Sequence, residues 1–212
     1  MILSILTQPY TNMPVSLDEM KAHLRVTSTN DDDFISSLVL AAASYVEKAT
    51  GQTTIQTQYQ LTLSDWCIEY PGATWVPTYG SPYGQYFYGP DPALTSRGEM
   101  LKVKLPRFPL VSIDSFTVDA AAKTDYGILS TAPAVLRVHT TPRPVAYEGG
   151  IIIQFTAGYA AREGVPATLK AAIKLIVGLW YRNREAATDK PLSEMPMGIC
   201  SLLDIESYNQ VG

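Results

Sequence analysis

The stretch FTAGYAAREGVPATLKAAIKLIVGLWYRNRE at residues 155–185 decides the fold of this chain. It joins the end of an apolar strand to a helix over 166–185 that is apolar around most of its circumference. The exceptions form one narrow stripe: Lys170, Lys174, Gly178, Tyr181 and Glu185. A lone surface helix needs a single apolar face. We therefore expect this helix to lie inside a bundle, at a subunit interface, or both.

The bulk composition describes a chain that can build a core. It has 212 residues, 46% hydrophobic and only 17% charged, enough for one large domain or a domain with an insertion. The net charge of −4 makes it a poor candidate for sequence-independent duplex binding, which needs clustered Lys and Arg. Cys67 and Cys200 are predicted to be buried thiols in a reducing cytosol, with a disulfide as the alternative.

The start of the chain, MILSILTQPY, has no basic flank and no long apolar run. We expect neither a signal peptide nor a membrane helix there. The sequence thus favours a soluble product made in the cytoplasm, with no membrane partner.

Two helices are predicted before the middle of the chain. Ser16 and Glu19 match a capping box, which favours a short helix ending near Val26. The acidic run 31–33 is expected to open a second helix, because carboxylates stabilise the positive end of the helix dipole. Gly51 is the expected stop.

From Gln52 the hydrophobic period changes from about 3.6 to 2, which is typical of strands. Apolar residues alternate in several short runs that predict a small antiparallel sheet or partial barrel: Tyr59 to Leu63, Leu101 to Leu105, Val111 with Ile113, Phe116 with Val118, Leu136 with Val138, and Ile151 to Phe155. Val165 and Pro166 then begin the long apolar helix, and a short last helix is expected from Ile199.

The order helix, helix, strands, helix, helix predicts an α+β fold. The N- and C-terminal segments would form a helical bundle, with an antiparallel β block inserted between them. The expected boundaries are 1–51 for an N-terminal arm and two bundle helices, 52–158 for the β block, and 159–212 for the remaining helices.

A loop over 71–98 interrupts the β block. Tyrosines alternate there with Gly and Pro, namely Tyr79, Tyr83, Tyr86 and Tyr88. Loops of this length inside a domain are usually functional or disordered. Tyr offers large contact area with few rotors, so we expect these residues to contact another subunit or partner; a mobile loop is the alternative.

The sequence carries no pattern of catalysis. His23 and His139 are isolated, and no metal-ligand spacing, phosphate loop or nucleophile motif occurs. We therefore expect no catalytic residue, no metal and no cofactor, and a protein that is not an enzyme.

Residues of the types enriched at interface hot spots gather at the end of the long helix. We predict a subunit interface made by Trp180, Tyr181, Arg182 and Arg184, together with Tyr45 of the second helix. The alternative is a core tryptophan beside arginines that close the helix.

Four segments in register resemble the head–tail connector (adaptor, or head-completion) proteins of long-tailed bacteriophages and gene-transfer particles. They are VSLDEMKAHLRV at 15–26, DDDFISSLVLAAASYVEKATG at 31–51, VKLPRFPLVSI at 103–113, and QFTAGYA followed by VPATLKAAIKLIVGLWYRNRE within 154–185.

The resemblance implies a structural virion protein at the head–tail interface, made in the cytoplasm of a host bacterium. It implies a ring, commonly of twelve subunits, between the capsid portal and the stopper or tail proteins. DNA would pass through its channel without specific binding. Members use C-terminal segments to engage the portal, so the expected portal contact is Ile199, Leu202, Leu203 and Tyr208.

Two other functions stay open at this point. A tail-completion or tail-tube protein would contact other tail rings instead of a portal. A carbohydrate- or host-binding module is the other alternative, suggested by Trp75 and the tyrosine loop.

Overall fold

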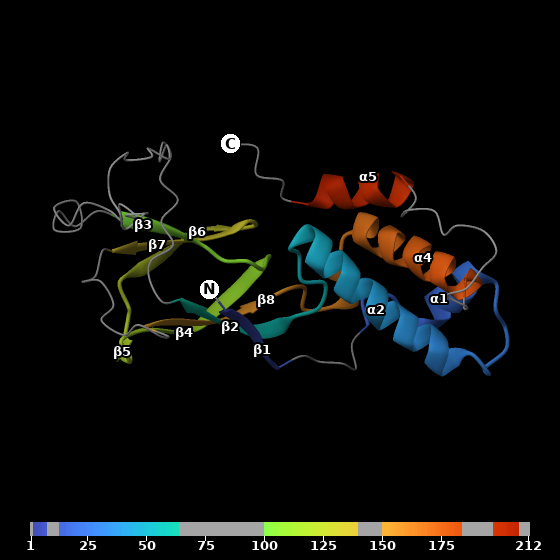
Figure 1. The fold of residues 1–212 in the computed structure, drawn as a ribbon, viewed down its shortest axis with the longest axis horizontal. Coiled ribbons are helices and arrows are strands. Elements are labelled where there is room, and N and C mark those ends of the chain that lie inside the picture. The colour runs from blue at the N-terminus through green and yellow to red at the C-terminus, as the bar shows by residue number, and fades with distance from the viewer. Residues whose placement is uncertain (1, 8–12, 64–99, 140–149, 184–196, 208–212) are drawn as a thin grey trace, which may run out of the picture.

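The computed structural model describes residues 2–7, 13–63, 100–139, 150–183 and 197–207. The molecule is elongated, with a β block at one end and a helical bundle at the other (Figure 1). The bundle is built from segments before and after the β block, and the strands pair antiparallel. The predicted α+β class is therefore confirmed. None of the helices within the described ranges has the length and apolarity to cross a membrane.

The bundle comprises α1 (Leu17–Leu24), α2 (Asp32–Thr50), α4 (Ala167–Arg182) and α5 (Met197–Glu206). The predicted cap of α1 is confirmed, since the Ser16 side chain accepts a hydrogen bond from the Glu19 amide at 3.1 Å. Gly51 ends α2 in the left-handed region with φ 77°. One apolar core joins the four helices, and its fully buried members include Met20, Ile35, Val39, Leu169, Ile173 and Ile176.

The long apolar helix α4 meets neighbours on several sides, as its composition predicts. It packs against α2, α5 and α1. Three residues of the narrow polar stripe, Lys174, Gly178 and Tyr181, are turned toward α1 and the start of α2 instead of solvent, and Glu185 lies outside the described residues. Lys174 Nζ pairs with Glu19 of α1 at 2.5 Å, and a Cβ added to the buried Gly178 would lie 3.7 Å from His23 of α1. The stripe is thus the face on which α1 rests.

The β block consists of two antiparallel sheets. One has the order β1 (Ile2–Thr7), β2 (Thr57–Leu63), β8 (Ile151–Ala157), β4 (Leu110–Val118) and β5 (Ala121–Ala122). The other has the order β3 (Met100–Lys104), β7 (Ala134–His139) and β6 (Tyr126–Thr131). Both sheets bury apolar side chains in one shared core that includes Tyr59, Leu61, Phe116, Leu136, Val138, Ile153 and Phe155. The block is therefore a small sandwich.

The N-terminal arm belongs to this sandwich. Residues 2–7 pair with β2 at the edge of the five-stranded sheet, with Ile2 opposite Thr62 and Ile5 opposite Tyr59. The arm is therefore an edge strand of the β block and does not pack as part of the bundle.

Strand β4 departs from simple alternation. Val111, expected to face inward, is 51% exposed, while Leu110 and Phe116 are buried. The pairing of β4 with β8 shifts register between Leu110 and Ser112 and again between Ile113 and Ser115. An extra residue in a bulge turns the following side chains to the opposite face, so a strict period of 2 fails here.

The structure also bears on the two cysteines and on the predicted contact residues. Cys200 is exposed, so the prediction of a buried thiol at this position is wrong. Cys67, Arg184, Tyr208 and the loop tyrosines Tyr79, Tyr83, Tyr86 and Tyr88 lie outside the described residues.

Candidate interaction surfaces

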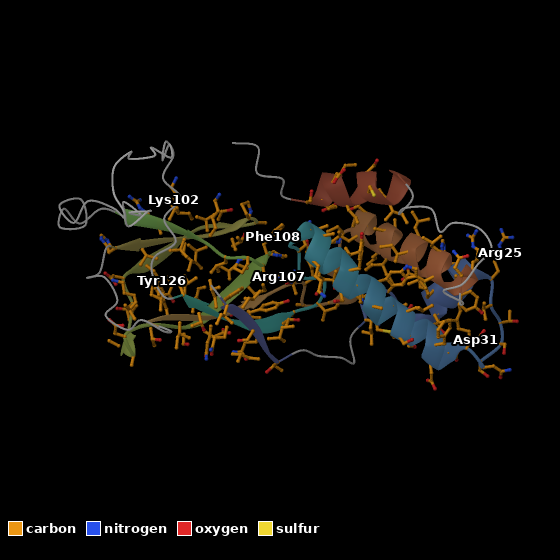
Figure 2. All side chains as sticks on the ribbon, in the orientation of Figure 1. Arg25, Asp31, Lys102, Arg107, Phe108 and Tyr126 are labelled. Carbon is orange, nitrogen blue, oxygen red and sulfur yellow. The ribbon has the colours of Figure 1, made fainter. Side chains whose placement is uncertain are left out.

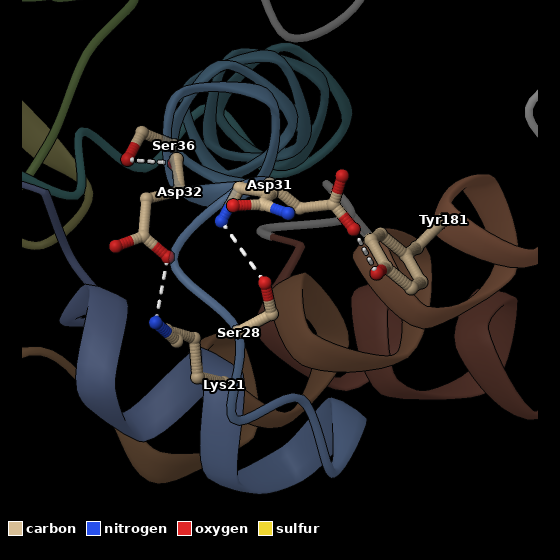
Figure 3. A network of polar contacts seen from close by, with 7 residues as sticks. Lys21, Ser28, Asp31, Asp32, Ser36 and Tyr181 are labelled. Atoms are coloured by element: carbon tan, nitrogen blue, oxygen red, sulfur yellow. Dashed lines mark hydrogen bonds and ion pairs between the residues drawn. The ribbon is translucent and has the colours of Figure 1, made fainter.

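The acidic run at the start of α2 ties three helices together (Figure 3). Asp32 Oδ1 accepts a hydrogen bond from Lys21 Nζ of α1 at 2.7 Å, and Asp31 Oδ2 accepts one from the Tyr181 hydroxyl of α4 at 2.6 Å. The acidic run opens α2, as predicted, with Asp31 as the N-cap residue, but the Asp31 side chain makes no capping hydrogen bond. The carboxylates therefore bind side chains of neighbouring helices while they also face the positive end of the dipole.

Glu19 of α1 makes the matching contact with α4. The hydrogen bond from Lys174 holds the pKa of the Glu19 carboxyl below its usual value, and the nearby charges of Lys174 and Lys170 act in the same direction. Such a partly exposed pair stabilises the fold by about 1 kcal/mol or less. The pair is a direct contact between α1 and α4.

The residues predicted to form the subunit interface lie in two different settings. Tyr181 is half-buried, and besides Asp31 its ring centroid lies 6.3 Å from that of Phe34. It therefore serves packing within the subunit. Arg182 is exposed at the end of α4.

Trp180 and Tyr45 are brought together by the antiparallel packing of α2 and α4. Their ring centroids are 6.5 Å apart with an interplanar angle of 83°, an edge-on arrangement favoured by aromatic quadrupoles. Trp180 is half-buried and packs on the helical core, while Tyr45 is 39% exposed. The pair forms an aromatic ridge, defined by these two residues, that remains open to a partner.

Helix α5 turns its predicted contact residues into its own bundle. Ile199 and Leu203 are 3% and 6% exposed, and Leu202 packs partly against the same core. An amphipathic helix buries its apolar stripe on the nearest apolar surface, here α4 and α2. The side of α5 that can meet another protein carries Cys200, Ser201, Asp204 and Ile205, the last 74% exposed.

Arg107 joins the β block to the end of α2 (Figure 2). Its Nη1 donates to the Glu47 carbonyl at 2.5 Å, and its guanidinium lies 5.9 Å from the centre of the Tyr59 ring. A cation at the last turn of a helix complements the dipole there. Burial raises the pKa of the Tyr59 hydroxyl, which also shares a hydrogen bond with Thr53 at 3.1 Å.

A second polar cluster holds α5 against the same joint, that is, the junction between the β block and the end of α2. Gln52 Nε2 donates to the Glu206 carboxylate at 2.9 Å, and the Tyr159 hydroxyl donates to Gln52 Oε1 at 3.1 Å. The Thr168 hydroxyl of α4 also donates to Glu206. Burial raises the pKa of Tyr159, and the charge of Glu206 adds to this shift. Residues far apart in the chain thus hold the end of α5 at the junction between the β block and the helical bundle.

No sequence pattern predicts these contacts between the β block and the bundle, because Arg107, Gln52 and Glu206 are isolated polar residues without a periodic pattern. The only available signal is that Arg107 lies within the segment 103–113 of the family resemblance. Within the described residues, no three His, Cys, Asp or Glu side chains are grouped so that they could hold a metal.

Comparisons with known proteins agree with the resemblance. Residues 14–79 match the model of a family described as phage gp6-like head–tail connector protein. No curated protein matches the chain.

Solved structures match over nearly the whole length. A chain in the neck of an empty GTA particle, determined with C6 symmetry, is 22% identical with a TM-score of 0.68; 98% of this chain and 95% of that chain are covered. A chain in the virion of a native gene transfer agent (GTA) particle is 20% identical with a TM-score of 0.66 and the same coverage of 98% and 95%. One in the neck of a native GTA particle, determined with C12 symmetry, is 19% identical with a TM-score of 0.62, again covering 98% and 95%.

The predicted recognition is thereby confirmed: residues 14–79 carry the signature of gp6-like head–tail connector proteins, and the chain as a whole has the fold of a protein found in gene transfer agent particles.

Proposed function

We propose that this protein is a structural neck subunit of a phage-like particle, without catalytic activity, that joins the capsid portal to the stopper or tail. The observation that carries the proposal is the match of the whole fold to a neck chain, with 98% of this chain covered at a TM-score of 0.68. The gp6-like connector signature at residues 14–79, a sequence match that includes α1, α2 and β2, supports the same assignment.

In this proposal the protein works as a ring, with twelve copies around the DNA channel. The matched neck structures were determined with C6 and C12 symmetry, both of which are compatible with twelve copies. A net charge of −4 suits a channel that passes DNA without holding it, because phosphate contacts to Lys and Arg bind strongly. The mechanism is geometric: a wedge-shaped subunit repeats and leaves a central passage.

The aromatic ridge of Tyr45 and Trp180, with Arg182 beside it in sequence, is the proposed bundle contact between neighbouring subunits. Tyr, Trp and Arg dominate interface hot spots because they bury large areas and keep a polar handle. The proposed portal contact of the C-terminal segment uses the outer side of α5, where Ile205 is 74% exposed, since Ile199 and Leu203 are already buried in the bundle.

The direct test mixes the purified chain with portal-bearing heads that lack a neck and images the product. We expect a ring of added density beneath the portal and recovery of tail attachment when the stopper and tail proteins follow. Binding to isolated tail tubes and not to the portal would favour the tail-completion function instead. Binding to glycans, with no affinity for heads, would favour a host-binding module.

Trp180→Ala is expected to reduce ring formation on the heads by about thirtyfold, the effect of losing a hot spot worth about 2 kcal/mol. Trp180→Phe keeps an aromatic edge next to Tyr45 and is the matched control, with a loss of less than about fivefold. The readout is the fraction of heads that carry neck density at a fixed protein concentration.

Because Trp180 also packs on the helical core, its variant is compared with Tyr45→Ala, which removes the exposed partner. Both alanine variants should lower ring formation, while Tyr45→Ala leaves the midpoint of thermal unfolding nearly unchanged. Wild-type head attachment by both variants would rule out the ridge as a subunit contact.

A further inference from the structure

The two outer faces of the β sandwich differ in charge. Since both sheets bury their inner sides in one core, their outer faces point away from each other. Figure 1 shows the two sheets stacked, with β3, β7 and β6 on one side and β1, β2, β8 and β4 on the other. A subunit with two dissimilar faces on opposite sides is suited to contacts between one face and the opposite face of the next copy.

The outer side of the three-stranded sheet is the basic face, defined by Lys102, Lys104, Arg137 and His139. All four side chains are exposed, and the register sets Lys102 of β3 directly opposite Arg137 of the central strand β7. Lys102 lies on the outer side of β3 in Figure 2. No Asp or Glu occurs in β3, β6 or β7, and Asp125, the residue before β6, lies near enough to His139 for their charges to interact. Like charges directly opposite each other destabilise a sheet, and a carboxylate from outside would relieve this repulsion.

The outer side of the five-stranded sheet is the Asp114 face, defined by Gln58, Gln60, Ser112, Asp114, Gln154 and Thr156. None of its five strands contains Lys or Arg. Asp114 is the extra residue of the second β4 bulge, between Ile113 and Ser115, and it is exposed on the outer side. The bulge therefore brings a carboxylate onto a face of amides and hydroxyls.

Asp114 is held in a fixed position. Its Oδ2 accepts hydrogen bonds from Gln58 Nε2 at 3.0 Å and from the Thr156 hydroxyl at 2.8 Å, and its Oδ1 accepts one from the Ser112 hydroxyl at 2.8 Å. A carboxylate has about four lone-pair positions, so it can still accept a bond from a cation. The side-chain amide of Gln154 donates to that of Gln60 at 3.1 Å, and these two residues complete the polar face.

We propose that neighbouring copies of this chain contact each other through their β blocks, with the basic face of one subunit against the Asp114 face of the next. Arg137, at the centre of the basic face, pairs with Asp114 of the neighbour, and Lys102 and Lys104 flank this pair. The inference rests on the proposed ring, because a closed ring needs two different patches on opposite sides of each subunit. It adds a polar contact to the one at the aromatic ridge.

Charge exchange tests the pairing. Arg137→Glu and Asp114→Lys should each lower the fraction of neck-bearing heads by about tenfold or more, because like charges then meet across the interface. The double variant R137E/D114K restores an opposite-charge pair, with reversed polarity, and should return ring formation to within about threefold of the wild type. Asp114→Asn, which keeps most of the local hydrogen bonds, separates loss of charge from loss of local structure.

Cross-linking gives a second readout on the assembled neck. In a chain with Cys67→Ser and Cys200→Ser, the pair Arg137→Cys and Asp114→Cys should form disulfides between subunits and give a ladder of multimers on heads. The matched control combines Arg137→Cys with Ala121→Cys at an exposed position of β5, and this pair should give no ladder.

The outcomes separate this contact from the proposed function. A ring on the portal with no ladder and no rescue by the double variant would overturn the contact and leave the neck assignment standing. Failure of the wild-type chain to bind heads at all would overturn both. An effect of Arg137→Glu on binding of a short duplex DNA alone, with ring formation unchanged, would show that the basic face meets phosphate instead and would also overturn the contact.

Discussion

Gly158→Ala is expected to lower the free energy of unfolding by about 3–5 kcal/mol, a large share of the stability of a domain. Gly158 has φ +112°, a conformation that side chains with a Cβ rarely adopt. A Cβ there would lie 2.7 Å from the Ile55 carbonyl oxygen and 2.9 Å from the Gln56 amide nitrogen. These are backbone atoms, which cannot move aside as a flexible side chain would.

The surrounding backbone leaves Gly158 no alternative position. Its amide donates to the Pro109 carbonyl at 2.8 Å, and the Gln56 amide donates to the Tyr159 carbonyl at 3.0 Å. The first bond joins the end of β8 to Pro109, just before β4, and the second joins it to the segment that follows α2. Strain at this point therefore acts on the connection between the β block and α4.

Chemical unfolding of the purified chain, followed by circular dichroism, measures the effect. Gly198→Ala in α5 is the matched control: nothing lies within 4 Å of its added Cβ, and alanine favours a helix over glycine by up to about 1 kcal/mol. We expect opposite signs for the two variants. Equal stability of both would contradict the close approach of the backbone at Gly158.

Arg107→Ala is the second large effect, with an expected loss of about 2–3 kcal/mol. The variant removes a charge-assisted hydrogen bond to the Glu47 carbonyl, worth about 1.5–3 kcal/mol, and a cation–π contact with Tyr59, worth about 0.5–1 kcal/mol. The Glu47 carbonyl keeps its bond from the Gly51 amide at 3.0 Å, which limits the loss. Arg107 Nε is buried without a hydrogen-bond partner, which costs stability in the wild type, so its removal makes the loss in Arg107→Ala smaller.

The matched control is Arg137→Ala on the exposed basic face, which should change stability by less than about 0.5 kcal/mol. Arg107→Lys keeps the charge but loses the planar group over Tyr59, so it should fall between the two. Unfolding of the β block and the bundle in one transition for the wild type, and in two for Arg107→Ala, would identify Arg107 as the link between them. A loss no larger than that of Arg137→Ala would contradict this role.

The helical half of the fold could be predicted because its signals are local. Apolar spacing of 3.6 residues, a capping Ser16 and a terminal Gly51 act within a few residues of where they stand. The all-round apolarity of α4 correctly indicated several neighbours. That Lys174 and Tyr181 serve contacts with α1 and α2 could not be foreseen, because a polar stripe has the same spacing whether it faces solvent or another helix.

The strand pairing and side-chain orientation of the β block were harder to predict from the sequence. A bulge in β4 reverses the alternation on which the prediction for Val111 depended, and β6 has no strong apolar alternation. The partner of β1 lies more than fifty residues away in the sequence, and no local preference identifies it. Strand pairing is set by register and by burial of one face, both of which are properties of the assembled sheets.

The sequence by itself determined the α+β class, the position of the bundle helices, the absence of a catalytic motif and the connector resemblance, because each depends on residue types at short spacing. Only the tertiary structure decided that Ile199 and Leu203 face their own core, that Tyr45 meets Trp180, and that Arg107 closes the joint. It alone placed Arg137 and Asp114 on opposite outer faces of one sandwich. The physical reason is that such contacts join residues far apart in the chain, and their free energy arises only once the shared core has brought them together.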